Sequence, residues 1–305
     1  MLGGNKIVIA GATGSVALPV TRRLARDNEI WAVARFSDAA ARAELEQAGV
    51  HCVATDLVDG DLAAVPTDPD YLVNFSVMKT GDWGRDLDGN AGGTGALMHH
   101  CTGARAVLHC SSTAVYQPGT GPFTEDAPLG DNHRVWSFLE TYSISKIAAE
   151  SMARFCARQL GIPTTIARLN VPYGECGGWP AVQLAMMVAD QPIAIRSDDP
   201  NVFNPIHTDD IIDMVPKLLD AATVPATVVN WGGVEPVGIQ EWCDHLGRLV
   251  GVEPTYVETD QTIRGVHIDT TRMEALVGPT AVSWRDGMRR VATEQFPERV
   301  DPDAR

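Results

Sequence analysis

Tyr142 and Lys146 stand four residues apart in the segment LETYSISKIAAESMARF, residues 139–155. The segment has the pattern of a helix, and this spacing places both side chains on one helix face. A phenol has an ordinary pKa of about 10, too high for proton abstraction near neutral pH. An ammonium group one helical turn away favours the phenolate. The pair is therefore either a device for proton transfer or an ordinary surface pair, and the surrounding elements decide between the two.

A glycine-containing loop, GATGSVA, follows the short β-branched run KIVIA and precedes a helical pattern. Gly11 permits a tight turn, and Gly14 lets backbone N–H groups approach a pyrophosphate at the helix N-terminus. Ala17 stands where a third small residue allows close packing of helix on sheet. A plain structural turn is the alternative, but the position after the first strand favours a dinucleotide site. The loop residues expected to contact the dinucleotide are Gly11, Thr13, Gly14, Ser15 and Val16.

The end of the second expected strand, VARFSD, selects the cofactor. An acidic residue there would bind the ribose 2′-hydroxyl of NAD, but this stretch has Ala34 and Arg35 instead. Arg35 can pair with a 2′-phosphate, and Ser37 can add a hydrogen bond. The sequence therefore favours NADP(H), although Asp38 keeps NAD possible. Further contacts are expected at the ends of the next two strands, from Asp56, Leu57, Asn74, Phe75 and Ser76.

Strands and helices alternate through roughly the first 170 residues. This rhythm predicts an α/β fold with a doubly wound parallel sheet, a Rossmann fold. We expect the dinucleotide-binding domain to span residues 1–169, with a returning segment near 203–233. Residues 170–202 and 234–300, where the rhythm breaks, are expected to form a smaller C-terminal α+β lobe that binds the substrate.

Composition narrows the class of partner. The formal net charge is -15, which disfavours nucleic acid and anionic membranes. No apolar run approaches the roughly 20 residues that span a bilayer, and the N-terminus lacks the layout of a signal peptide. The six cysteines show no metal-ligand spacing, so no metal site is expected. These features predict a cytoplasmic protein with a small-molecule substrate.

Six motifs in order resemble the extended short-chain dehydrogenase/reductase family, also called the NAD-dependent epimerase/dehydratase family. They are GATGSVA, NAGGTGALM, SSTAVY, YSISK, RLNVPYG and IHTDDI, and they extend over most of the chain. The resemblance implies that Tyr142 is the general acid/base, Lys146 its activator and Ser112 the hydroxyl that orients the substrate oxygen. It also implies cofactor contacts from Tyr142, Lys146, Asn90, Asn170 and Val171, and a homodimer formed by the two long helices near residues 93 and 142.

Departures from the family pattern limit the reaction. Family members that dehydrate or decarboxylate sugars carry an acid just after the catalytic hydroxyl residue, where this chain has Thr113 and Ala114. Nucleotide-sugar enzymes of the family usually have an arginine just before the IHTDD-like motif to hold the diphosphate. Phe203 and Asn204 occupy that stretch here, and Asp198 and Asp199 lie nearby; Arg196 or Arg264 are possible substitutes, but neither matches the spacing.

The resemblance therefore implies an NAD(P)-dependent oxidoreductase that transfers hydride between the cofactor and an alcohol or carbonyl of a small or sugar-like molecule. A sugar epimerase that works by transient oxidation needs the same Ser, Tyr and Lys, and it remains the alternative. Trp179 either stacks on a ring of the substrate or packs within the lobe.

Overall fold

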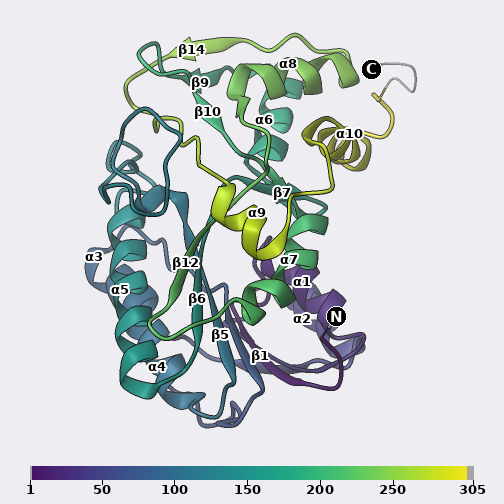
Figure 1. Cartoon of the computed structure of the whole chain (residues 1–305). Helices are drawn as coiled ribbons and strands as arrows, with labels where there is room; N and C mark the ends of the chain where they lie inside the picture. The colour runs from purple at the N-terminus through teal and green to yellow at the C-terminus, as the bar shows by residue number, and fades with distance from the viewer. Residues whose placement is uncertain (1, 301–305) are drawn as a thin grey trace.

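A seven-stranded parallel sheet forms the centre of the molecule (Figure 1). The computed structural model describes residues 2–300. Neighbouring strands follow the order β12-β6-β5-β4-β1-β2-β3, and every adjacent pair is parallel. The strands are β1 Lys6–Ala10, β2 Glu29–Ala34, β3 His51–Ala54, β4 Tyr71–Asn74, β5 Ala106–Ser112, β6 Thr164–Leu169 and β12 Thr227–Trp231.

The strand order confirms the expected doubly wound α/β fold. The chain runs outward from β1 to β3 on one side and then crosses to β4 on the other side of β1. Open parallel sheets of this kind bind ligands at the carboxyl ends of the strands, beside the point where the order reverses. Strands β4, β5 and β6 are almost entirely buried, as their apolar runs require.

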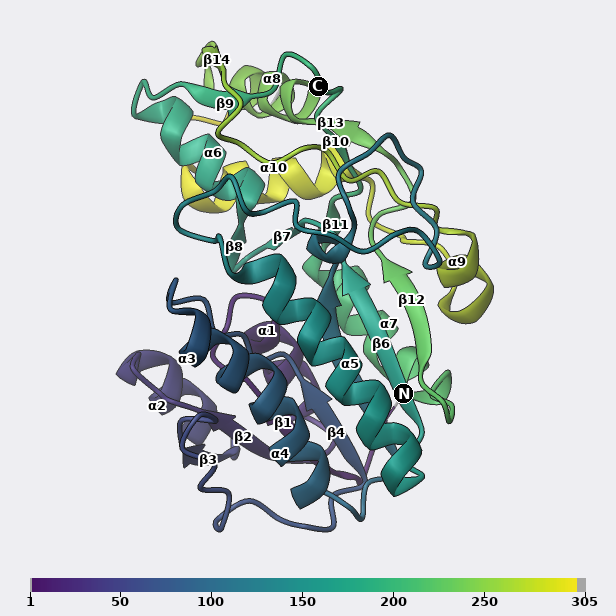
Figure 2. The same ribbon diagram turned by 90° about the vertical axis from the view of Figure 1, so that its left-hand side faces the viewer.

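Helices cover both faces of the sheet. On one face lie α4 Gly93–His100 and α5 Tyr142–Leu160, which run side by side in Figure 2. The other face carries α1 Ala17–Leu24, α2 Ala39–Gln47 and α7 Thr208–Asp220. Helix α5 begins at Tyr142 itself, three residues later than the helical pattern of the sequence, and it ends where Gly161 takes a left-handed conformation.

A smaller lobe covers the carboxyl ends of the strands and has its own hydrophobic core (Figures 1 and 2). It contains three helices, α6 Trp179–Val188, α8 Ile239–Val250 and α10 Trp284–Gln295. Two pairs of short strands complete it: β9 Ile193–Ile195 with β14 Tyr256–Glu258, and β10 Val202–Phe203 with β13 Val237–Gly238.

Between two stretches of this lobe, the chain returns to the sheet. It passes through β11 Ile206–His207, which pairs with β7 Pro172–Gly174, and then through α7 to the edge strand β12. The remaining short elements are α3 Trp83–Leu87, the π-helical turn η1 Asp88–Gly92, the 3-10 turn η2 Thr113–Val115, β8 Gly177–Gly178 and α9 Thr271–Val277. Among residues 2–300, none of the helices combines the length and the apolar character that a membrane crossing requires.

Candidate active site

Ser112, Tyr142 and Lys146 line one cavity of about 680 Å³ between the sheet and the smaller lobe. Ser112 is the last residue of β5, and its hydroxyl accepts a hydrogen bond from the backbone N–H of Ala114 at 3.1 Å. Tyr142 and Lys146 come from the first two turns of α5. The Ser112 hydroxyl lies close enough to the phenol of Tyr142 to lower its pKa. Side chains from two segments that are distant in sequence thus meet at the carboxyl edge of the sheet.

Burial controls the proton affinities of this group. Burial raises the pKa of Tyr142 to about 12, and the nearby Ser112 hydroxyl only partly opposes this shift. Burial lowers the pKa of Lys146, whose Nζ donates to the backbone carbonyl of Cys110 at 2.9 Å. Among the protein groups, Ser112 lowers the pKa of the phenol, but burial outweighs it. The cationic ring of a bound nicotinamide would add to the charge of Lys146 in favouring the phenolate.

The buried carboxylate of Asp86 fixes the start of α5. Asp86 accepts hydrogen bonds from the Thr141 hydroxyl at 2.6 Å, from the Thr80 backbone N–H at 2.8 Å and from the Gly81 N–H at 3.0 Å. Burial alone would raise the pKa of Asp86, but hydrogen bonds from Thr141 and Thr80 keep it below its ordinary value. The carboxylate therefore connects the loop after β4 to the residue that precedes Tyr142.

A second cavity, of about 180 Å³, lies at the glycine loop. A Cβ on Gly11 would lie 2.7 Å from the backbone of Ser76, so only glycine allows this close approach. Phe75 and Val77 line both this cavity and the larger one, so the two are adjacent. The residues of the cofactor expectation that line the second cavity are Gly11, Thr13, Gly14, Arg35, Ser37, Asp56, Leu57, Phe75 and Ser76. Their arrangement fits the adenosine and phosphate end of a dinucleotide.

Other residues of the expected cofactor site divide into two groups. Val16 and Val171 line the larger cavity, whereas Ser15 is exposed beside the loop and lines neither. The side chains of three buried asparagines line neither cavity and are engaged by the protein. Asn74 donates to Thr94, Asn90 binds both backbone groups of Met78, and Asn170 donates to the Val266 carbonyl. These three side chains hold neighbouring segments together and do not face a cofactor.

The two residues expected to distinguish NADP(H) from NAD, Arg35 and Asp38, follow the end of β2. Asp38 caps α2, where its carboxylate accepts hydrogen bonds from the backbone N–H groups of Ala40 and Ala41. It is therefore engaged away from a ribose hydroxyl. Arg35 is exposed and lines the second cavity, with no acidic residue taking the position that NAD-specific sites use.

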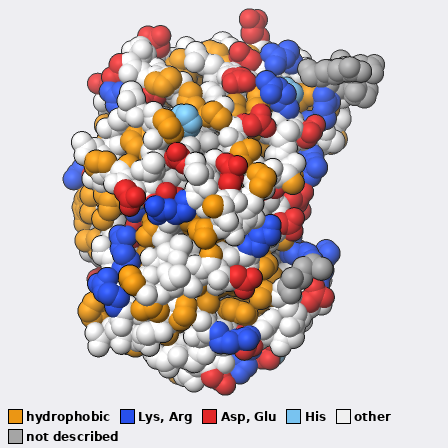
Figure 3. All heavy atoms as spheres, in the orientation of Figure 1, with side chains coloured by type: hydrophobic (Ala, Val, Ile, Leu, Met, Phe, Trp, Pro, Cys, Tyr) orange, Lys and Arg blue, Asp and Glu red, His pale blue; other side chains and the backbone are white. Residues whose placement is uncertain are grey.

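The substrate side of the larger cavity is apolar, which the motifs did not reveal. Phe203, at the position of the family's phosphate-binding arginine, is buried there, with its ring centroid 5.1 Å from that of Trp179. The apolar residues that line the larger cavity include Trp136, Phe138, Trp179, Val182, Met186, Phe203, Ile263 and Val266. Phe138 and Val182 are 63% and 56% exposed, so the rim is apolar too. In Figure 3, hydrophobic side chains gather at the left-hand edge, on the side where α3 and α5 lie in Figure 1.

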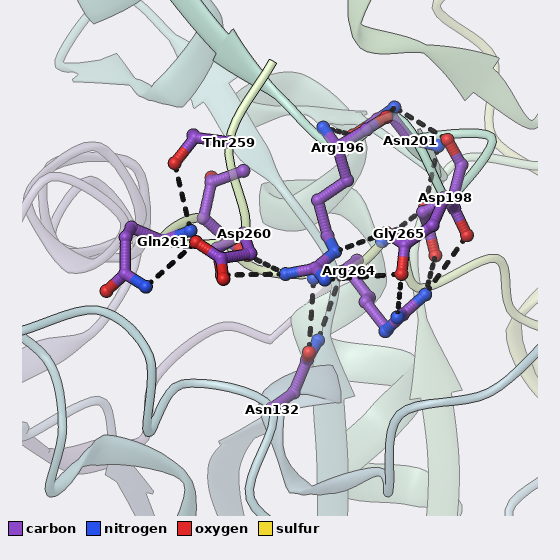
Figure 4. A network of polar contacts seen from close by, with 11 residues as sticks. Asn132, Arg196, Asp198, Asn201, Thr259, Asp260, Gln261, Arg264 and Gly265 are labelled. Carbon is purple, nitrogen blue, oxygen red and sulfur yellow. Dashed lines mark hydrogen bonds and ion pairs between the residues drawn. The ribbon is translucent and has the colours of Figure 1, made fainter.

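Both arginines that could have replaced the phosphate clamp are engaged by aspartates (Figure 4). Arg196 pairs with Asp198 at 2.8 Å and donates to the backbone carbonyls of Asp260 and Thr262. Arg264 pairs with the same Asp198. Neither arginine lines the larger cavity. Their network instead holds the loop that brings Thr262 and Ile263 to the cavity wall.

His133 is a cavity residue to which the sequence assigned no role. Its ring packs edge-on against that of Tyr142 with centroids 5.2 Å apart, and its Nδ1 lies 3.2 Å from the Ser143 hydroxyl. Burial lowers its pKa to about 4, so the ring is neutral near pH 7. Just past Ser112, Thr113 and Ala114 are buried and provide no carboxyl group.

Solved structures of low sequence identity share this fold. The UDP-glucuronic acid 4-epimerase from Bacillus cereus, in complex with UDP-glucuronic acid and NAD, has a TM-score of 0.81 at 19% identity, covering 95% of this chain and 98% of that one. The UDP-N-acetylglucosamine 4-epimerase from Methanobrevibacter ruminantium M1 gives 0.83 at 14% identity, covering 97% and 100%. A dTDP-glucose 4,6-dehydratase double mutant from Streptomyces venezuelae with NAD bound gives 0.80 at 21% identity, covering 96% and 98%.

No curated protein sequence matches the chain at a significant level. The sequence model of the NAD dependent epimerase/dehydratase family, in contrast, matches residues 7–232. This match includes the glycine loop, the strand that ends at Ser112 and the helix that carries Tyr142 and Lys146. The resemblance that the six motifs indicate is thereby confirmed, and the chain belongs to the NAD dependent epimerase/dehydratase family.

Proposed function

We propose that this protein is an NADP(H)-dependent oxidoreductase that interconverts an alcohol and a carbonyl group of a small molecule. One observation carries the proposal: the side chains of Ser112 and Tyr142 line one cavity, and this cavity adjoins the cavity at the glycine loop. A substrate oxygen that binds both hydroxyls would place its carbon at the nicotinamide end of a bound dinucleotide. The nicotinamide cofactor supplies the chemistry of accepting or donating a hydride.

The protein residues then have distinct tasks. The Ser112 hydroxyl holds the substrate oxygen, and the Tyr142 phenol gives a proton to that oxygen during reduction or takes one during oxidation. Lys146, buried beside them, contributes positive charge that favours the phenolate. Its ammonium group and the apolar walls Val16, Leu169 and Val171 line the same cavity as the phenol.

Tyr142→Phe tests the proposal directly. We expect the variant to lose turnover while it still binds NADP(H), because the phenylalanine ring keeps the packing and removes only the proton donor. Tyr71→Phe is a matched control, since Tyr71 lies on β4 and lines neither cavity. Retained turnover in Tyr142→Phe would contradict the assignment.

A sugar epimerase with NAD is the second candidate, and the likeness to solved epimerases favours it. It requires the same three residues, but it keeps its cofactor through the whole cycle. Denaturing the purified protein and measuring the released nucleotide separates the two candidates. Stoichiometric NAD would favour the epimerase, whereas release of little nucleotide together with NADPH oxidation in turnover would favour the oxidoreductase.

We also propose that the protein forms a homodimer through α4 and α5, which lie side by side on one face (Figure 2). Phe155 on α5 is 49% exposed, which is unusual for a large aromatic side chain without a partner. Light scattering that shows only the monomer would reject this dimer. The cytoplasmic location stays a prediction from the sequence.

A further inference from the structure

Gln183 on α6 lines the larger cavity although it is only 2% exposed. Its Oε1 accepts a hydrogen bond from the indole Nε1 of Trp242 at 2.7 Å. The Cys243 Sγ contacts the same oxygen at 3.9 Å. Because an indole N–H can only donate, this contact fixes which end of the amide faces Trp242. The amide oxygen is therefore held by the core of the lobe, and the NH₂ group is the end left for other partners.

No group among residues 2–300 accepts a hydrogen bond from that NH₂ group. Its neighbours along the cavity wall are apolar, with Val182 and Met186 on the same helix and Phe203 and Ile263 from other segments. The Gln183 nitrogen is not among the fully buried polar atoms that lack a partner, so it reaches the space of the cavity, where a bound molecule can provide an acceptor. A single oriented donor in an apolar wall is the arrangement by which binding pockets fix the orientation of a ligand.

Resting on the proposed function, we infer that the substrate is an uncharged, ring-bearing ketone or alcohol with a second hydrogen-bond acceptor that binds the Gln183 NH₂ group. In the direction of reduction, the carbonyl carbon gains a hydride from the reduced nicotinamide, and its oxygen gains a proton from Tyr142. The aromatic side chains Trp136, Trp179 and Phe203 provide faces and edges for a ring.

The same wall disfavours a diphosphate-linked substrate. Phe203 takes the place of a phosphate-binding guanidinium, and Arg196 and Arg264 are both paired with Asp198 outside the cavity. The wall around Gln183 and Phe203 offers a diphosphate no cationic partner, since Lys79 and Lys146 line other parts of the cavity. The acceptor on the substrate is therefore expected to be a neutral oxygen, such as an ether, ester or carbonyl.

Three pairs of ketones test the inference, and the members of each pair differ only in an ether oxygen against a methylene group. Acetophenones with a methoxy group at the ortho, meta or para position are compared with the ethyl compounds of the same shape, using NADPH. We expect kcat/KM to be about tenfold or more higher for methoxy than for ethyl in at least one ring position. Gln183→Met keeps the length of the side chain and removes both the donor and the acceptor of the Trp242 indole, so this preference should fall to about one. Gln191→Met, at an exposed glutamine that lines neither of the two cavities, should preserve it.

The possible failures are distinguishable. Equal kcat/KM for methoxy and ethyl ketones at every position, or a preference unchanged in Gln183→Met, would overturn the role of Gln183. Turnover of UDP-glucose with none of the aryl ketones would overturn the substrate class. Neither result decides the proposed function, which is tested independently by whether Tyr142→Phe loses turnover. If Gln183→Met does not fold, the methoxy preference of the unaltered protein still decides the outcome.

Discussion

Glu150 of α5 and Arg168 of β6 form a buried ion pair through two hydrogen bonds of 2.8 Å each. The side chains are 0% and 2% exposed, respectively. Ser111 on β5 donates to the same carboxylate at 2.7 Å. The helix that carries Tyr142 and Lys146 is thus joined by charged groups to the two strands beneath it, which fixes its register on the sheet.

Removing one partner of this pair should destabilise the protein strongly. Glu150→Leu leaves the Arg168 guanidinium buried without its carboxylate, so we expect the free energy of unfolding to fall by about 3–5 kcal/mol. Urea denaturation at pH 7 measures this. The double variant Glu150→Leu with Arg168→Met should be more stable than the single variant, because no charge remains buried and unpaired. A single variant within about 1 kcal/mol of the unaltered protein would contradict this account.

Asp86 should matter for rate more than for cofactor binding. Asp86→Asn replaces a carboxylate that accepts from Thr80, Gly81 and Thr141 by an amide with only one accepting atom. The residue before Tyr142 then loses its anchor, and we expect kcat to fall about tenfold with little change in the Kd of NADP(H). Steady-state kinetics and fluorescence titration check this, with the exposed Asp88→Asn as control. An unchanged kcat would show that α5 holds its position without Asp86.

Arg35 should distinguish the two nicotinamide cofactors. Because it is exposed at the second cavity and Asp38 is engaged in capping α2, Arg35→Ala removes the group expected to pair with a 2′-phosphate. We expect the Kd of NADP⁺ to rise about tenfold or more, with NAD⁺ affected less than about twofold. Isothermal titration with both nucleotides measures the ratio. The exposed Arg26→Ala serves as control, and an equal loss for both nucleotides would contradict NADP(H) preference.

His133 should make the folded protein sensitive to acid. Its pKa is lowered by burial to about 4, whereas an unfolded histidine titrates near 6.5. Its contribution to stability is therefore complete above about pH 6.5 and is lost as the pH falls towards 4, since the unfolded chain binds the proton first. In His133→Gln, the slope of unfolding free energy against pH should fall by about 1.4 kcal/mol per unit in this window. Urea denaturation from pH 4 to pH 7 measures it, and an unchanged slope would contradict the shift.

The sequence predicted the sheet from local patterns, whereas the grouping of Ser112 with Tyr142 and Lys146 came from the resemblance to a family. Apolar runs define the strands, and the carboxyl ends of parallel strands must meet at one edge. The orientation of Asn74, Asn90 and Asn170 did not follow in the same way. Whether a polar side chain at a strand or helix end faces a ligand depends on distant partners, such as Val266 for Asn170.

Local sequence patterns also could not predict that the substrate cavity is apolar. A phenylalanine at residue 203 indicated only that a guanidinium was absent, and the structure adds that its ring packs against Trp179. The meaning of Gln183 depends on Trp242, which lies 59 residues further along the chain and holds only the oxygen of the amide. No periodicity records such a pairing, because it arises only when α6 and α8 pack together.

Phe75 and Val77, which line both cavities, have a consequence for the order of events in catalysis. In the proposed function, a dinucleotide that spans both cavities would pass this segment, and a substrate already bound beside Tyr142 would obstruct its nicotinamide half. We therefore expect an ordered kinetic mechanism, in which the nucleotide binds first and is released last. The bound nucleotide would form one wall of the site that the substrate then enters.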